Sequence, residues 1–328
     1  MVKQVLQTVG MSQNALNPKE SAIDLAVAGY LKAQAEQKDL GNLSPATVAQ
    51  RGFALGVLLE WAHVAGVEDP KELNEAKLNE YMRWLLKRKR RGKLLSRETA
   101  RSYTRATQPF LKWSKAPTEG FKPLKGEGYR EMKEAVTREE LARMEAACGD
   151  ERDRLIIRLL GQSALRVQEC LDLSLASLKE NKIAKSYSVR VVGKGNHNEQ
   201  KKERFAPVTA DVFRRLKSYA ENGPVPGGAF IFYARRSRGG KVQRLTRSGV
   251  DQMVRNVAEI AKVSRPDRRI YPHVLRHAAL TNWLLAGINP EVAETWMGHS
   301  DLKLIMKVYS HLDIDRTHEK FEAAFGKD

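Results

Sequence analysis

The chain has 328 residues, enough for two domains that each enclose a hydrophobic core. Its hydrophobic fraction of 42% excludes a generally disordered protein. The formal net charge of +18, from 57 Lys+Arg against 39 Asp+Glu, exceeds what solubility requires and indicates a polyanionic partner, most commonly nucleic acid. Charge alone leaves open a basic soluble protein, such as a ribosome-associated factor.

The first part of the chain is predicted to be a flexible leader followed by a helical domain. Residues 1–18 have no sustained apolar periodicity and end at Asn17-Pro18. Apolar residues then recur at helical spacing, and Ser44-Pro45 resembles an N-cap followed by proline in the first turn. The pattern predicts an all-helical domain at 19–115, with helices over 19–38, from 44, over 72–90 and over 96–115.

A dense run of cations lies between the last two predicted helices. Residues 83–93 contain seven basic side chains and no acidic one. A solvated helix end with cations at its C-terminus would explain some of them, but cations this close repel one another. We expect contact with a phosphate backbone from Arg83, Lys87, Arg88, Lys89, Arg90, Arg91 and Lys93.

A segment rich in Pro, Gly and Lys at 116–135 is predicted to be a linker, and a second domain is expected over 136–328. Thr137 with Glu140 resembles a capping box that opens this domain. Residues 186–192 and 204–208 are predicted to form a β-hairpin around a turn at 193–195. A short strand is expected at 230–233, and the rest is predicted to be helical. A basic loop should follow the short strand and contact DNA through Arg235, Arg236, Arg238 and Lys241.

The remaining composition restricts the environment of the protein. The two cysteines, Cys148 and Cys170, form no disulfide framework, and no Cys and His spacing suggests a structural zinc. Cys170 lies in an apolar helical run and is expected in the core. Neither a secretory signal nor an apolar run of membrane-spanning length is present. These features predict a soluble protein in a reducing compartment with no membrane partner.

The last half of the chain contains an ordered set of residues suited to phosphodiester chemistry. The segments are Ala164-Leu-Arg166-Val-Gln-Glu169, His273-Val-Leu-Arg276-His277, Gly298-His299-Ser300 and Tyr309. A tyrosine can attack phosphorus as a nucleophile, and arginines can neutralise the charge that develops during the attack. A structural salt bridge between Arg166 and Glu169, three residues apart, is an alternative role for these two residues.

These segments, together with Gly193-Lys194-Gly195, resemble in order and spacing the motifs of the tyrosine recombinase, or phage integrase, family. The resemblance covers residues 137–315, and the helical domain before them is similar to that family's core-binding domain. It implies a mainly α fold: a helical core-binding domain and an α+β catalytic domain with a small antiparallel sheet, together forming a clamp around DNA. Each motif alone is weak, whereas four in the right order are specific.

The resemblance also implies roles for individual residues. Tyr309 would be the nucleophile, Arg166 and Arg276 would bind the phosphate, and Glu169 would organise Arg166. Lys194, or Lys201 or Lys202 of the same hairpin, would protonate the departing 5′ oxygen. His273 would transfer protons, and His299 would contact the scissile phosphate.

A zinc site is the competing interpretation for His273 and His277, which are four residues apart. The motif lacks the glutamate of a metalloprotease, and the intervening Arg276 would oppose a dication. We therefore expect no metal site. The transesterification implied by the resemblance also needs no cofactor, because one phosphodiester is exchanged for another.

The resemblance implies partners as well. The expected partner is double-stranded DNA with inverted-repeat core sites, bound by a homotetramer on paired sites, with an accessory bending or directionality protein as a further possibility. The protein would be monomeric or weakly associated without DNA and would act in the cytoplasm, on the bacterial nucleoid. A tail with Phe321, Ala323, Ala324 and Phe325 either folds back or docks on a neighbouring protomer. A type IB topoisomerase and a catalytically inactive DNA-binding relative are the alternatives.

Overall fold

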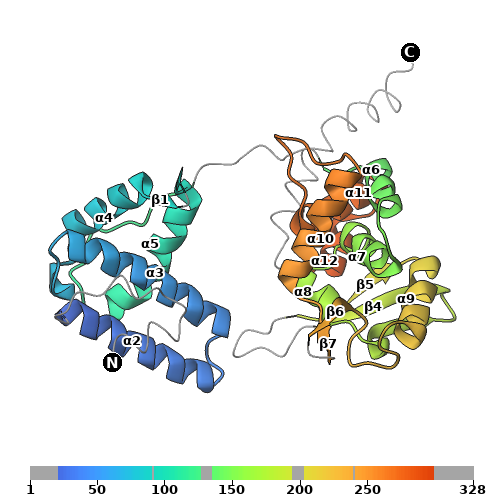
Figure 1. Ribbon diagram of the computed structural model, residues 1–328, viewed down its shortest axis with the longest axis horizontal. Helices are drawn as coiled ribbons and strands as arrows, with labels where there is room; N and C mark the ends of the chain where they lie inside the picture. Colours follow the sequence, from blue (N-terminus) through green and yellow to red (C-terminus); the bar gives the residue numbers. More distant parts are fainter. Residues whose placement is uncertain (1–20, 91, 127–134, 194–202, 239–240, 299–328) are drawn as a thin grey trace, which may run out of the picture. The chain divides into compact units, whose positions relative to one another are not determined.

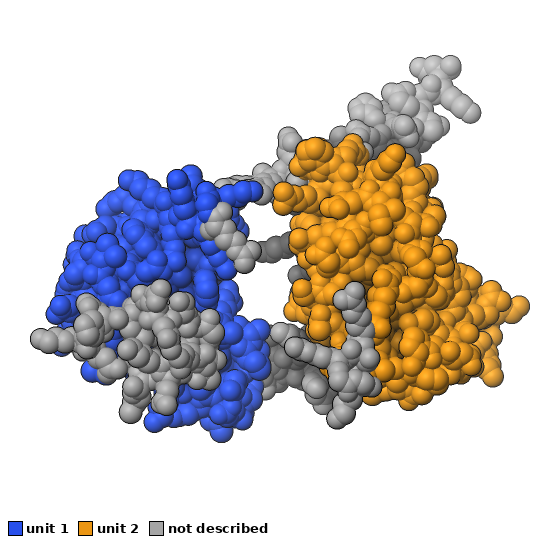
Figure 2. Space-filling view, viewed as in Figure 1, with its two compact units in different colours: residues 1–131 blue, residues 132–328 orange. Residues whose placement is uncertain are grey.

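The computed structural model describes residues 21–90, 92–126, 135–193, 203–238 and 241–298. The chain divides into two compact units, residues 1–131 and 132–328, which are distinguished by colour in Figure 2. Both units are mainly helical, and the strands form small antiparallel sheets, as the sequence predicts (Figure 1). Within the described ranges, no helix combines the length and the apolar character needed to cross a bilayer.

The first unit consists of four α-helices, a short 3-10 turn and a small hairpin in its described part. Each α-helix begins after a Ser or Asn whose side-chain oxygen accepts the backbone N–H three residues later. These caps fix the start of every helix at the residue after the cap. The elements are α2 (Ala22–Asp39), α3 (Pro45–Val64), η2 (Pro70–Glu72), α4 (Glu75–Lys87), β1 (Lys89–Arg90), β2 (Lys93–Leu94) and α5 (Arg97–Trp113).

The core of this unit combines aliphatic side chains with aromatic pairs. The rings of Trp61 and Tyr81 lie 5.3 Å apart and those of Tyr30 and Phe110 5.7 Å apart. Asp24, buried at 2% exposure, accepts hydrogen bonds from the Ser21 hydroxyl and pairs with Nε2 of His63 at 3.0 Å. A buried carboxylate thus ties the start of α2 to the end of α3.

The helix predicted over 72–90 is wrong at both ends. Asn74 caps a later start, and α4 ends at Lys87 because Arg88 adopts an extended backbone. Lys89 and Arg90 then pair with Leu94 and Lys93 as strands β1 and β2. Gly92, at φ +77°, takes the left-handed conformation that this tight turn requires. The basic run therefore spans the end of α4 and the β1–β2 hairpin, rather than a helix end alone.

The second unit surrounds a three-stranded sheet and a two-stranded hairpin with helices in its described part. Thr137 and Glu140 form the predicted capping box of the first helix. The helices are α6 (Arg138–Ala146), α7 (Glu151–Gly161), α8 (Val167–Leu171), η3 (Leu175–Ser177), α9 (Ala210–Asn222), α10 (Arg247–Ile260), α11 (Pro272–Leu285) and α12 (Pro290–Met297). The strands are β3 (Leu178–Asn181), β4 (Ser186–Val192), β5 (Glu203–Val208), β6 (Tyr233–Arg238) and β7 (Lys241–Arg244).

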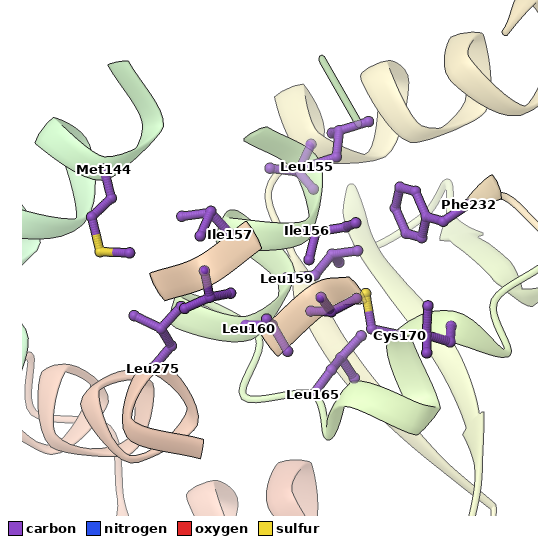
Figure 3. Packing of buried hydrophobic residues seen from close by; sticks show 14 of the residues in the cluster. Met144, Leu155, Ile156, Ile157, Leu159, Leu160, Leu165, Cys170, Phe232 and Leu275 are labelled. Atoms are coloured by element: carbon purple, nitrogen blue, oxygen red, sulfur yellow. The ribbon is translucent and has the colours of Figure 1, made fainter. Parts of the chain in front are cut away.

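The predicted hairpin is confirmed as β4 and β5, which pair antiparallel with Val191 opposite Arg204. Strand β3 lies on the other side of β4 and was not predicted. Val189, Val191 and Ala206 of the sheet are buried in the core of this unit. Figure 3 shows part of that core, where Leu155, Ile156 and Leu159 of α7 pack near Cys170 and Phe232. Cys170 is 1% exposed, as expected of a small core residue.

The strand predicted at 230–233 is wrong. Ile231 and Phe232 are apolar because both are buried in the core, and the Ile231 N–H donates to the Leu173 carbonyl. The strand begins at Tyr233 and pairs with β7, so the predicted basic loop at 235–241 is largely a two-stranded hairpin. Short apolar runs occur both in buried connecting segments and in paired strands, so the run at 230–233 did not tell the two apart.

An ion pair between Glu140 and Arg268 in the second unit should make the free energy of unfolding depend on pH in the acidic range. Glu140 accepts two hydrogen bonds from Arg268, at 2.8 and 2.7 Å, and the Arg268 side chain is 3% exposed. The hydrogen bonds from Arg268 lower the pKa of Glu140 below its ordinary value of 4.5, against the opposing effect of burial. The stabilisation is therefore present above the unfolded-state pKa and is lost as pH falls through the folded-state value.

We expect Glu140→Gln to lower the free energy of unfolding by about 3 kcal/mol at neutral pH, because the buried Arg268 charge loses its partner. The difference from the unmodified chain should shrink as pH falls below 4.5. Chemical denaturation across pH 3–7 checks this, with Glu180→Gln at an exposed carboxylate of β3 as the control. A difference that is independent of pH would contradict the role of this pair.

Candidate phosphate-binding site

The first predicted arginine lies at the corner between α7 and α8. Ala164 has φ +50°, a left-handed conformation that turns the chain after α7. Arg166 is the N-cap of α8, and Glu169 in the first turn accepts the Arg166 backbone N–H at 2.7 Å. The same carboxylate accepts Nη1 of Arg166 at 3.0 Å, so the predicted salt bridge is present. The Arg166 side chain is 41% exposed and remains accessible to a ligand.

The second predicted arginine lies on α11, which begins at Pro272 with its N-cap at Tyr271. Arg276 is 2% exposed and donates to the carbonyl of Ala164 and, at 2.9 Å, to that of Met297. These bonds join the α7–α8 corner, α11 and the end of α12. His273 is exposed one turn before Arg276, and its ring lies 4.3 Å from that of His277.

Glu169 is the common ion-pair partner of the two arginines. Its side chain is 9% exposed, and Oε2 lies 3.7 Å from Nη1 of Arg276. The structure therefore brings together three of the predicted residues, Arg166, Arg276 and Glu169, from segments more than a hundred residues apart. An arginine pair held on one buried carboxylate is preorganised to bind an anion such as a phosphate.

A third arginine at this cluster was not predicted. Arg204 of β5 donates from Nη2 to Oε2 of Glu169 at 2.7 Å, and its side chain is 10% exposed. The sequence does contain a signal, because Arg204 shares the inward-facing register of Val191 in a half-buried strand. A cation at such a position needs a buried partner. The cluster now has three cations against one carboxylate.

A small apolar cluster contains the two residues whose carbonyls accept from Arg276. Ala164, Ala279, Leu280, Leu284, Ala293 and Met297 are all buried and pack together. Gly298 follows α12 with φ +90°, a conformation that favours glycine. The other predicted catalytic residues, Lys194, His299 and Tyr309, lie outside the described residues. Among the residues that are described, no group of three or more His, Cys, Asp or Glu side chains is arranged for a metal ion.

The first basic run is mostly exposed on the α4 end and the β1–β2 hairpin. Arg83, Lys87, Lys89, Arg90 and Lys93 are exposed, whereas Arg91 lies outside the described residues. Arg88 differs from these, because it pairs with Glu60 at 2.7 Å and lies over the Trp84 ring at 5.0 Å. Its guanidinium therefore supports the fold in addition to any contact with a ligand.

The second basic segment is anchored to α7. Arg235 of β6 donates to Asp150 at 2.7 Å and also pairs with Asp153. Burial is the largest single effect on the pKa of Asp150 and raises it, but the hydrogen bonds from Arg235 and from the Asp153 backbone, together with the charges of Arg235 and Arg152, hold the pKa below its usual range. The backbone of Arg236, Arg238 and Lys241 belongs to the β6–β7 hairpin, and the side chains of these three residues lie outside the described part of the molecule.

Comparison with known proteins gives matches over most of the chain. A model of the phage integrase family matches residues 131–316. The chain is 30% identical to tyrosine recombinase XerD of Yersinia pestis over 51% of its own length and about half, 52%, of that protein. It is 28% identical to tyrosine recombinase XerC of Pelobacter propionicus over 87% of its length and 91% of that protein.

Two solved structures with a similar fold are a site-specific recombinase bound to its substrate and a transposon integrase in complex with DNA. The XerH site-specific recombinase bound to palindromic difH substrate superimposes with a TM-score of 0.65 at 18% identity, covering 98% of this chain and 94% of that one. The Tn1549 transposon integrase in complex with transposon right end DNA superimposes with a TM-score of 0.60 at 18% identity, covering 90% of this chain and 98% of that one. At this level of identity the likeness concerns the fold.

Proposed function

Because the chain belongs to the phage integrase family of tyrosine recombinases, we propose that it is a site-specific DNA recombinase that breaks and rejoins strands through a 3′-phosphotyrosyl intermediate. The observation that carries the proposal is the pair Arg166 and Arg276, held on Glu169 from separate segments. Two guanidinium groups at one place match the non-bridging oxygens of a phosphodiester.

The proposed reaction is a pair of transesterifications. Tyr309 attacks phosphorus, a bond forms between its oxygen and the 3′ phosphate, and the 5′ oxygen leaves. Arg166 and Arg276 stabilise the extra negative charge on the phosphate oxygens. Lys194 donates the proton that the departing oxygen needs, and His273 and His299 assist proton transfer and phosphate contact. The 5′ hydroxyl of a second strand then reverses the step, so neither ATP nor a metal ion enters the balance.

The proposed substrate is double-stranded DNA with inverted-repeat core sites, held in a clamp between a core-binding domain at 19–115 and a catalytic domain at 136–328. Paired sites would be bound by a homotetramer, with an accessory DNA-bending or directionality protein where direction is controlled. The proposed place of action is the nucleoid of a bacterial cytoplasm. The surplus of basic residues supports a DNA partner.

The C-terminal tail is proposed to join protomers by docking on a neighbour. Its apolar side chains need cover, and the second unit offers a groove of about 550 Å³ lined by Trp283, Ile288 and Trp296. Cross-linking on substrate DNA should give tetramers from the full chain, and Phe321→Asp with Phe325→Asp should reduce them. Monomers alone on substrate DNA would overturn tail docking.

The function is tested with a pool of nicked suicide duplexes, incubated with and without EDTA and resolved on a denaturing gel. A covalent adduct that persists in EDTA, is linked through Tyr309 and selects one inverted-repeat sequence is the expected result. Adducts on every sequence would indicate a type IB topoisomerase instead. Tight DNA binding without any adduct would indicate an inactive DNA-binding relative.

The β1–β2 hairpin gives a separate prediction about affinity. Replacing the exposed Lys89 and Lys93 by Gln should weaken binding to all DNA sequences alike, because phosphate contacts carry no sequence information. The slope of log K against log salt should become shallower by about 0.9 for each lost contact. Titrations at several salt concentrations measure this, with Lys32→Gln and Lys71→Gln as a charge-matched control. An unchanged slope would remove the hairpin from the interface.

A further inference from the structure

We propose that Arg204 is a positioning residue for the strand-cleavage reaction: it holds Glu169 in the place from which the carboxylate orders Arg166 and Arg276. The inference rests on the proposed function. Arg204 would not touch the phosphate, and it would act through Glu169 and through the chain turn at Gly298.

The first support is the set of contacts around Glu169. Its Oε2 atom accepts Nη2 of Arg204 and the backbone N–H of Arg166, both at 2.7 Å. The same atom lies 3.7 Å from Nη1 of Arg276, beyond hydrogen-bond distance. The two short contacts of this oxygen are thus made by Arg204 and the Arg166 backbone, and its ion pair with Arg276 is longer. Arg204 therefore holds the one carboxylate that both predicted arginines share.

The second support is the burial of Arg204. Its side chain is 10% exposed, and Nε has no hydrogen-bond partner within the described part of the chain. A guanidinium is rarely buried without complete pairing, because its desolvation is expensive. Packing alone would be satisfied better by an apolar side chain at this position, next to Val191 and Ala206. The cation is therefore present for its charge and geometry.

The third support links Arg204 to the second histidine motif. A Cβ atom on Gly298 would lie 3.4 Å from Cδ and 3.5 Å from Nε of Arg204. The Arg204 side chain thus lies beside Gly298, which precedes His299 in the chain. Strand β5 also follows directly after the segment that contains Lys194. Arg204 is consequently the residue through which Glu169, β5 and the end of α12 meet.

The consequence of removing Arg204 follows from the charges. Without it, Oε2 of Glu169 loses a charged partner at 2.7 Å, and its ion pair with Arg276, which is 3.7 Å long, is expected to shorten. A shorter ion pair would compete more strongly with the phosphate for Arg276. The cleavage step should slow, although the DNA contacts made elsewhere are intact. The effect should depend on the charge of Glu169.

The test compares Arg204→Met, Arg204→Lys and Arg204→Met combined with Glu169→Gln, by single-turnover adduct formation at saturating suicide substrate. Supporting partners of ligating groups are commonly worth about 10- to 100-fold, so we expect Arg204→Met to slow adduct formation by about that factor with an unchanged Kd for DNA. Arg204→Lys, which keeps the charge and one donor, should recover part of the rate. In the Glu169→Gln background, Arg204→Met should have little further effect.

Arg190→Met is the matched control, because Arg190 lies in the same sheet, is 40% exposed and pairs with the neighbouring strand's exposed Glu203. Equal rates for Arg204→Met and the unmodified chain, equal slowing in Arg190→Met, or full additivity with Glu169→Gln would each overturn the inference. If Arg204→Met does not fold, an Arg204→Lys variant with the full rate and no coupling to Glu169 would overturn it as well. If the unmodified chain forms no adduct, the proposed function and this inference both fail; any other adverse result removes the inference alone.

Discussion

Replacing Tyr309 by phenylalanine is expected to abolish the covalent protein–DNA adduct. The phenyl ring has no oxygen to attack phosphorus, and loss of a nucleophile commonly lowers the rate by about 10⁴-fold or more. DNA binding should be unaffected, because the basic surfaces that hold the backbone are unchanged. The measurement is adduct formation on nicked suicide duplex with the Kd determined on the same DNA, so that a loss of chemistry is separated from a loss of binding.

The matched control is Tyr271→Phe. Tyr271 is exposed and lies directly before α11, close in sequence to the predicted histidine and arginine. It differs from Tyr309 in preceding the two histidine motifs rather than following them. This variant should form the adduct at the rate of the unmodified chain. An adduct that persists in Tyr309→Phe and disappears in Tyr271→Phe would assign the nucleophile to the other tyrosine.

The second large effect is expected at Arg276, where catalysis and stability depend on one side chain. Arg276→Met should lower the rate of adduct formation by about 10²- to 10³-fold, the usual loss for one preorganised donor to a developing charge. It should also lower the free energy of unfolding by about 3 kcal/mol, because buried acceptors at Ala164, Met297 and Glu169 lose their partner.

Arg166→Met separates the two effects. The Arg166 side chain is 41% exposed, whereas that of Arg276 is 2% exposed. Removing Arg166 should therefore leave fewer buried polar groups without a partner than removing Arg276. We expect a similar loss of rate with a clearly smaller loss of stability. Denaturant unfolding and single-turnover adduct assays on both variants give the comparison. Equal losses of stability would show that burial does not distinguish the two arginines, and an unchanged rate in either would remove that arginine from the phosphate site.

Local chemistry explains which elements were predictable. The helix starts at Pro45 and Arg138 follow capping residues whose side-chain bonds involve only neighbouring residues, and these starts are confirmed. The hairpin of β4 and β5 follows from alternation in one short segment. The strands at Lys89–Arg90 and Lys93–Leu94 were missed, because charged residues carry no apolar alternation, and only the turn at Gly92 shows the pairing.

Long-range contacts explain what the sequence did not reveal at the site. Arg166 and Glu169 are three residues apart, and their pairing is visible in the sequence itself. Arg204 reaches the same carboxylate from 35 residues away, and its role emerges only when β5 is placed beside the α8 corner. Lys194, His299 and Tyr309 lie outside the described residues, so their roles stay predictions that the adduct experiments test.

The shared carboxylate has a consequence for how the protein is made. Arg166 and Glu169 are synthesised almost together, Arg204 follows 35 residues after Glu169, and the Met297 carbonyl, which accepts from Arg276, comes later still. Since domains generally fold in order of synthesis, the helical first unit can form while the ribosome is still completing the second. A nascent or prematurely terminated chain that stops before Met297 lacks the acceptor that fixes Arg276. If the proposed function holds, a chain that stops there carries an incomplete phosphate site.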